Sequence, residues 1–91
     1  MFLIVAYDIA NDGRLLRVST KLKDYGERVQ RSVFECILDE RKLQSLIREV
    51  TPLIEPEGDS IRIYRLCEGC RKGVSIYGRG VVTEDQDVFI V

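Results

Sequence analysis

The first residue whose type suggests chemistry is Asp8, which ends the apolar run FLIVAYD. A carboxylate after a strand commonly accepts hydrogen bonds from the amides of the next loop, as in an Asx turn. Such a carboxylate is also a suitable ligand for Mg²⁺, which accepts one or two carboxylates and keeps several waters. A twofold axis near the strand tip would place Asp8 beside its own copy, and a divalent cation would relieve their repulsion. The sequence leaves both interpretations open.

The chain contains no histidine. Catalysis by Ser-His-Asp or Cys-His groups and metal sites with histidine ligands are therefore excluded. Any hydrolysis would have to use carboxylates, a metal-bound water, or both.

The cysteines offer a second candidate site. Cys67 and Cys70 form the motif C-E-G-C, and Cys36 is distant in the sequence. A structural zinc site needs four ligands, so we expect a redox or incidental role for the pair and a core position for Cys36. The GRG at 78–80 lacks the G-K-[ST] ending of a phosphate-binding loop and predicts a turn.

The charge is unevenly distributed along the chain. The net charge is −1 and the pI is about 5.4, which argues against nucleic-acid binding by bulk charge alone. Six bases and only two acids nevertheless lie between residues 14 and 31; the bases are Arg14, Arg17, Lys21, Lys23, Arg28 and Arg31. This region is either a solvated helix face or a basic surface that contacts phosphates.

Aromatic residues lie close in the sequence to Asp8 and to the basic region at 14–31. Arg28, Arg31 and Phe34 alternate with apolar residues. They predict either a polar outer face or phosphate contacts, with Phe34 as a packing residue or as a platform for a base. Tyr7 should point to the face opposite Asp8 and is expected in the core.

The first third of the chain predicts a strand and a helix. The continuous apolar run at 2–8 is typical of a strand that is covered on both faces. Asn11 or Asp12 can cap a helix from about 12 to 25, where apolar residues recur at helical spacing. Gly26 suits the left-handed position that ends such a helix.

The middle of the chain predicts a further strand region and helix. Residues 28–38 favour one strand, or two short strands bent near Arg31 and Ser32. Asp39 can cap the second helix, which should end or kink at Pro52 because the residue before proline avoids helical geometry. An apolar stripe supports this helix: Leu43, Leu46, Ile47 and Val50.

The last third predicts strands. Alternation at 60–66 is typical of a strand, residues 67–73 resemble a loop, and short strands are expected at 74–77 and 87–91. The order β-α-β(β)-α-β predicts an α+β, ferredoxin-like βαββαβ sandwich with additional C-terminal strands. We therefore expect a ferredoxin-like domain at 1–78 and a C-terminal strand tail at 79–91 that pairs with the partner subunit of a homodimer.

The length and the N-terminus indicate the class of protein. Ninety-one residues suffice for one domain with a small core, which a dimer would help to stabilise. The apolar start is too short to cross a bilayer and lacks the features of a signal peptide, so a cytoplasmic protein with no membrane partner is expected.

The sequence resembles the CRISPR-associated endonuclease family, the smaller of the two universal CRISPR adaptation (spacer acquisition) proteins. The matching segments cover nearly the whole chain in order: VAYDI, GRLLRV (13–18), LKDYGERVQRSVFEC (22–36), DSIRIYRLCEGC (59–70) and VTEDQDVFIV (82–91). The combination of YDI, VQRSVFE and RIYRLC is specific.

The resemblance implies a ferredoxin-like homodimer with a Mg²⁺ site that is built from the Asp8 residues of the two subunits. It implies metal-dependent endonuclease cleavage of phosphodiester bonds in RNA or duplex DNA, and spacer integration together with the larger integrase-like adaptation protein. The positions that match the family's functional ones are Asp8 and, beside it, Tyr7, Arg17, Arg28 and Phe34. The alternative is a non-catalytic dimeric adaptor that bridges integrase dimers on DNA and does not need Asp8.

Overall fold

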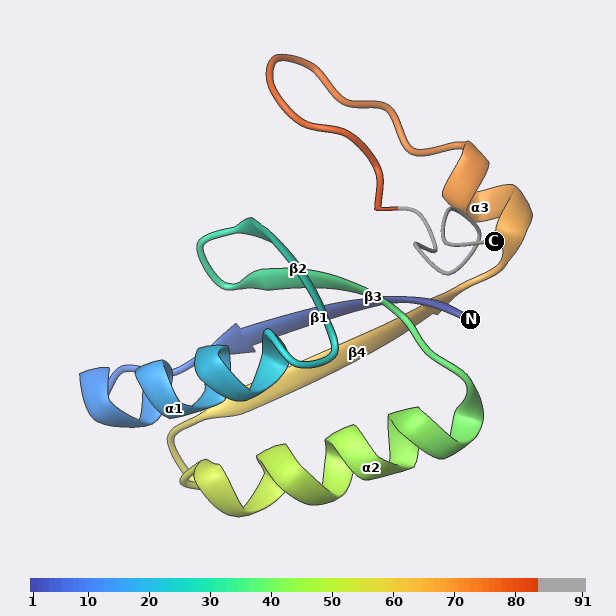
Figure 1. The fold of residues 1–91 in the computed structure, drawn as a ribbon. Coiled ribbons are helices and arrows are strands. Elements are labelled where there is room, and N and C mark those ends of the chain that lie inside the picture. The colour runs from blue at the N-terminus through green and yellow to red at the C-terminus, as the bar shows by residue number, and fades with distance from the viewer. Residues whose placement is uncertain (84–91) are drawn as a thin grey trace.

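The computed structural model describes residues 1–83. Its elements, in chain order, are β1 (Phe2–Asp8), α1 (Asp12–Leu22), β2 (Gly26–Gln30), β3 (Val33–Ile37), α2 (Glu40–Val50), a short 3-10 helix η1 (Thr51–Leu53), β4 (Ser60–Leu66) and α3 (Glu68–Lys72). The strands form one antiparallel sheet in the order β2-β3-β1-β4, and α1 and α2 cover one of its faces (Figure 1). The predicted α+β, ferredoxin-like sandwich is confirmed.

The central strand β1 has one face toward the helices and one face away from them. Leu3, Val5 and Tyr7 are buried on the helix side, where Phe34 lies opposite Val5 and Cys36 lies opposite Leu3. The other face of the sheet, which we call the open face, is covered by neither α1 nor α2, and α3 lies on this side at one end of the sheet (Figure 1). On β1 its residues are Phe2, Ile4, Ala6 and Asp8, because successive side chains in a strand alternate between faces.

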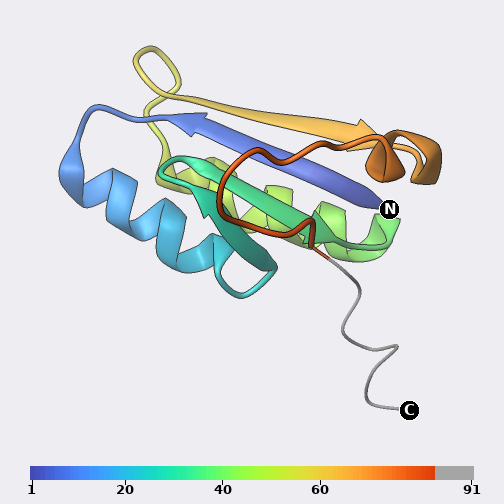
Figure 2. The same cartoon turned by 90° about the horizontal axis from the view of Figure 1, so that it is seen from above.

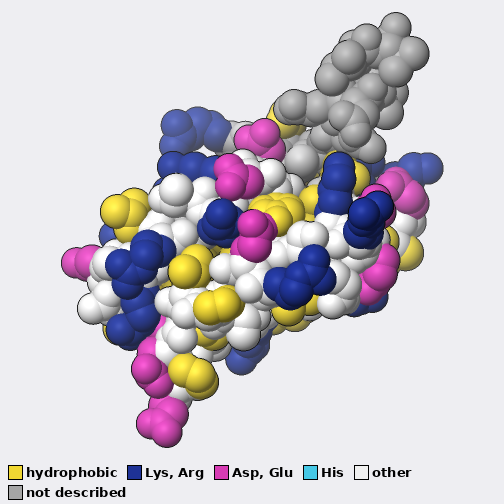
Figure 3. Space-filling model, turned by 60° about the horizontal axis from the view of Figure 1, so that its bottom comes forward, with side chains coloured by type: hydrophobic (Ala, Val, Ile, Leu, Met, Phe, Trp, Pro, Cys, Tyr) yellow, Lys and Arg dark blue, Asp and Glu magenta, His cyan; other side chains and the backbone are white. Residues whose placement is uncertain are grey.

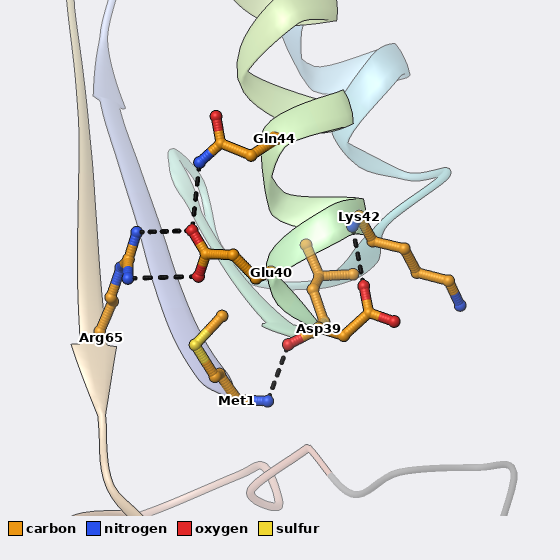
Figure 4. Close-up of polar contacts among 7 residues, drawn as sticks. Met1, Asp39, Glu40, Lys42, Gln44 and Arg65 are labelled. Atoms are coloured by element: carbon orange, nitrogen blue, oxygen red, sulfur yellow. Dashed lines mark hydrogen bonds and ion pairs between the residues drawn. The ribbon is translucent and has the colours of Figure 1, made fainter.

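The two long helices begin where the sequence predicted. The side-chain oxygen of Asn11 accepts a hydrogen bond from the Arg14 amide at 2.9 Å, and Asp39 accepts one from the Lys42 amide at 2.8 Å (Figure 4). Each of these bonds satisfies an amide that has no partner within its helix. The next residue, Glu40, forms an ion pair with Arg65 of β4, whose Nη1 lies 3.4 Å from Glu40 Oε2. The start of α2 therefore also contacts the sheet (Figure 4).

Helix α1 ends at Leu22, so the prediction of a helix to residue 25 closed by a left-handed Gly26 is wrong. Gly26 instead begins β2. A Cβ there would lie 2.3 Å from the Glu35 carbonyl oxygen and 2.5 Å from Cys36 Sγ. Glycine is required because β2 and β3 approach closely at this point. Of the two alternatives for residues 28–38, the structure has two strands with a turn at Arg31 and Ser32.

Two predictions after β4 are wrong. Residues within the expected loop at 67–73 form α3, and the expected strand at 74–77 is not one. A strand needs a neighbouring edge, and this segment pairs with none within residues 1–83. The turn at 78–80 is confirmed, since Gly78 and Gly80 have φ of 97° and 124°. The strand expected at 87–91 lies outside the described residues, as does most of the predicted tail at 79–91.

The core lies between the sheet and the two long helices. Its buried members include Leu22 of α1 and Leu43, Leu46 and Val50 of α2, which confirms most of the predicted stripe. The segment after α3 passes over the open face near β2 and β3 (Figure 2). Within residues 1–83, no helix has the length and apolar character that crossing a membrane requires.

Candidate functional site

Asp8 is an exposed carboxylate at the end of β1, directly opposite Ser60 at the start of β4. Its position in the alternation of β1 places it on the open face. No amide within residues 1–83 donates a hydrogen bond to its carboxylate, and the helix that follows is capped by Asn11 instead. The Asx-turn interpretation is therefore not supported, and the Asp8 oxygens are accessible to a cation.

The turn between β2 and β3 lies at the same end of the sheet as Asp8. Tyr7 holds this turn with two bonds: its amide donates to the Ser32 carbonyl at 3.0 Å and its hydroxyl donates to the Arg31 carbonyl at 3.4 Å. The Tyr7 side chain is buried, as expected for a core residue. Arg31 is exposed at this turn, so a basic side chain and the Asp8 carboxylate share one end of the sheet.

Arg14 forms an ion pair with Asp59, a residue that the sequence did not single out. Arg14 Nε lies 2.7 Å from Asp59 Oδ2, and the Glu55 amide donates to the same oxygen at 2.8 Å. The Asp59 side chain is 1% exposed. The hydrogen bond from Arg14, followed by that from the Glu55 amide, holds the pKa of Asp59 below its ordinary value, and the same pairing raises the pKa of Arg14. In this chain Arg14 therefore joins α1 to the loop before β4.

Phe34 is wholly buried, so the structure favours packing over a base platform for this ring. Its register opposite Val5 puts it on the helix side of the sheet. A ring with no exposed surface presents no face on which a base could stack, so its burial supports packing, one of the two predicted alternatives. The Arg28 guanidinium carbon lies over the Phe34 ring, 5.5 Å from its centroid.

Three of the predicted basic residues, Arg17, Arg28 and Arg31, are exposed. No carboxylate within residues 1–83 lies within 4.0 Å of their guanidinium nitrogens. They come from different elements: α1, β2 and the turn before β3. On the helix side of the molecule, basic and acidic side chains are interspersed (Figure 3), which favours the solvated-surface interpretation there.

A metal site within one copy of the chain is not complete. No group of three or more His, Cys, Asp or Glu side chains in the described part of the chain could hold a metal ion. Asp8 alone supplies the type of hard oxygen that Mg²⁺ prefers. The residues fit Mg²⁺ only if further ligands are waters or come from a second copy.

The segment after α3 is anchored to the open face by one arginine. Arg71 donates to the Thr83 carbonyl at 2.8 Å, and its guanidinium carbon lies 5.7 Å from the centroid of the Phe2 ring. The Thr83 amide in turn donates to Glu35 at 3.0 Å. The chain is therefore held over β3 as far as the described residues extend.

Comparisons with known proteins show which family and which solved structures this chain is similar to. The model of the family described as CRISPR associated protein Cas2 matches residues 1–74. CRISPR-associated endoribonuclease Cas2 1 of Chloroflexus aurantiacus is 43% identical over 93 residues, which cover 100% of both chains. Streptococcus pyogenes Cas2, in a crystal structure at pH 6.5, aligns with a TM-score of 0.77 and 34% identity over 86% of this chain and 100% of that chain. A chain of a partial Cas6-RT-Cas1–Cas2 complex aligns with a TM-score of 0.66 and 28% identity over 82% of this chain and 88% of that chain.

Proposed function

Because the chain belongs to the Cas2 family of CRISPR-associated proteins, we propose that it is a Mg²⁺-dependent endonuclease that acts in CRISPR adaptation as a homodimer. The observation that carries the nuclease proposal is the Asp8 carboxylate, exposed on the open face at the tip of β1 and free of local hydrogen bonds within residues 1–83. The name of the C. aurantiacus relative, an endoribonuclease, supports the reaction class.

The open face supports a second copy as the missing half of the site. Apolar side chains on this face retain exposure, among them Tyr64, which is 46% exposed. Side chains that are only partly buried lie around it: Ile4, Ala6, Val33, Ile37 and Leu66. Burying such a surface against its own copy stabilises a dimer. The tail at 79–91 would add its strand to the partner subunit, because β4 is an edge strand within the described residues.

In this proposal the Asp8 carboxylates of the two subunits together would hold one Mg²⁺, which would supply polarisation of a phosphate oxygen and a coordinated water of lowered pKa. Arg31, at the same end of the sheet, contacts a flanking phosphate, and Arg17 and Arg28 contact phosphates farther along the nucleic acid. Tyr7 keeps the Arg31 turn in place through its two hydrogen bonds. The chain supplies no histidine as a general acid, so slow cleavage is expected.

The test is cleavage of RNA and of duplex DNA by the wild type and by Asp8→Asn, with Mg²⁺ and with a chelator. We expect Asp8→Asn to lose about 100-fold or more in rate and the chelator to abolish cleavage by the wild type. Asp24→Asn is the matched control, because Asp24 is exposed in the loop that follows α1. A wild type that cuts neither substrate at any Mg²⁺ concentration, or an Asp8→Asn variant that cuts normally, would contradict the proposal.

The alternative is a non-catalytic adaptor that bridges integrase dimers on DNA. It is favoured by the similarity to a chain of a complex whose title includes Cas1 and Cas2. Assembly with the larger, integrase-like adaptation protein would depend on the tail and the exposed arginines, not on Asp8. Spacer acquisition by Asp8→Asn separates the two: acquisition at the wild-type rate indicates an adaptor, and its loss indicates a catalytic requirement.

A further inference from the structure

Cys67 and Cys70 form a close pair of thiols outside the site described above. Their Sγ atoms lie 3.3 Å apart, and both residues are exposed. Within residues 1–83 no third His, Cys, Asp or Glu side chain joins them to form a metal-binding group. The geometry is therefore that of a vicinal dithiol and not of a zinc site.

The backbone holds the two sulfurs in position to react with each other. Cys67 is extended, with φ −74° and ψ 168°, and it caps α3, while Cys70 lies in the first turn of that helix. The Cys70 amide donates to Cys67 Sγ at 3.3 Å. A disulfide needs about 2.05 Å between the sulfurs, and the two Sγ atoms are already only 3.3 Å apart.

The two thiols are not equivalent. The hydrogen bond from the Cys70 amide, together with that from the Cys70 thiol, lowers the pKa of Cys67. The bond with Cys67 raises the pKa of Cys70. The lower pKa and the amide hydrogen bond favour Cys67 as the thiolate, which is the nucleophile in thiol chemistry, and Cys70 as the thiol that reacts second.

We propose that Cys67 and Cys70 form a thiol–disulfide exchange site that takes low-molecular-weight disulfides, such as oxidised glutathione, as substrates. The Cys67 thiolate attacks one sulfur of the small disulfide, forms a mixed disulfide and releases one thiolate. Cys70, after losing its proton to solvent, attacks Cys67 Sγ and releases the second thiolate. The protein dithiol loses two electrons and two protons, and the small disulfide is reduced to two thiols.

The third cysteine provides an internal control. Cys36 has no exposed surface, and burial raises its pKa to about 11. It presents neither access nor thiolate character, so it should remain a thiol under conditions that oxidise the other two.

The experiment uses the full chain, reduced and then incubated with mixtures of reduced and oxidised glutathione. After an acid quench the chain is redissolved in denaturant at neutral pH, so that every free thiol, including that of Cys36, is labelled with a maleimide, and intact masses are measured. In the wild type we expect the free thiols of Cys67 and Cys70 to disappear together, as an internal disulfide without a glutathione adduct. The Cys36 thiol should still be labelled. Cys70→Ser should trap one glutathione on Cys67, at a rate at least about tenfold above that of Cys67→Ser. Cys36→Ser should behave as the wild type does.

Three results would overturn the proposal. One is a wild type whose two thiols stay reduced in oxidised glutathione. Another is the accumulation of glutathione on both cysteines without closure to a disulfide. The third is an equal rate of glutathione addition to the Cys67→Ser and Cys70→Ser variants. Far-UV circular dichroism of each variant establishes that these comparisons are made between folded chains.

Discussion

Arg14 and Asp59 are separated by 45 residues of sequence, yet Arg14 Nε lies 2.7 Å from Asp59 Oδ2. The pair ties the first turn of α1 to the loop before β4. Since Ser60 pairs with Asp8 across the sheet, this link also fixes the strand end that neighbours the candidate ligand. Within residues 1–83, Arg14 thus has a structural ion pair that Arg17, Arg28 and Arg31 lack.

The ion pair predicts an acid-dependent loss of stability. The folded-state pKa of Asp59 lies below its unfolded value of about 3.9. Its contribution is therefore fully present above that value and is lost as the pH falls through the folded-state pKa. Asp59→Asn should unfold more easily at pH 7 and show a shallower decline in stability in acid. Urea unfolding from neutral pH to about pH 3 measures this, with Asp24→Asn as the control; parallel pH profiles for wild type and Asp59→Asn would contradict it.

The exposed arginines should differ from Arg14 in nucleic-acid binding. Removing one phosphate contact lowers the slope of log affinity against log salt by about 0.9 for duplex DNA. We expect this change for Arg31→Ala and for Arg17→Ala. Arg14→Ala should lower the melting temperature and leave the salt slope of the folded fraction unchanged. Binding titrations at several salt concentrations test the distinction, which fails if Arg14→Ala reduces the slope as the other two variants do.

Gly26 should be far less tolerant of substitution than another glycine of the chain. A Cβ at position 26 would meet the Glu35 carbonyl oxygen at 2.3 Å, whereas a Cβ at Gly58 would meet nothing within 4 Å. Gly26→Ala should cost about 2 to 3 kcal/mol or prevent folding, because strands β2 and β3 must separate. Gly58→Ala should change stability by less than about 1 kcal/mol. Chemical denaturation of both variants gives the comparison, and similar values for the two would refute the close approach.

Phe34 should matter for stability and not for base contact. Truncation of this fully buried ring, Phe34→Ala, should cost about 3 to 5 kcal/mol. Tyr77→Ala, at a side chain that is 93% exposed, should stay within about 0.5 kcal/mol of the wild type. Phe34→Leu keeps most of the volume, and its folded fraction should bind nucleic acid as the wild type does. A loss of binding by folded Phe34→Leu would restore the base-platform interpretation.

The long elements could be predicted because their patterns are strong. The apolar run of β1, the capped stripe of α2 and the alternation of β4 each extend over seven or more residues. The order of these elements was sufficient to identify a ferredoxin-like sandwich. Helix α3 has only five residues, which is too short to show a helical period.

The features of the structure that the sequence did not predict depend on contacts between segments that are distant in the chain. Gly26 suits a helix end as well as a strand that approaches its neighbour closely, and only the position of β3 decides between them. Asp59 reads as part of the turn EPEGD until Arg14 is placed beside it. The position of Asp8 after an apolar run predicts a candidate ligand, and its exposure agrees with that prediction.

The close approach of β3 to Gly26 also limits which substitutions related sequences can carry at this position. Many tight contacts in an interior change in pairs, in which one side chain grows while its neighbour shrinks. A smaller residue in place of Cys36 would remove the sulfur that a Cβ at position 26 meets at 2.5 Å, but the Glu35 carbonyl oxygen belongs to the backbone and would remain. No substitution on β3 can compensate for a side chain at this position, so it should not covary with any neighbour among related sequences.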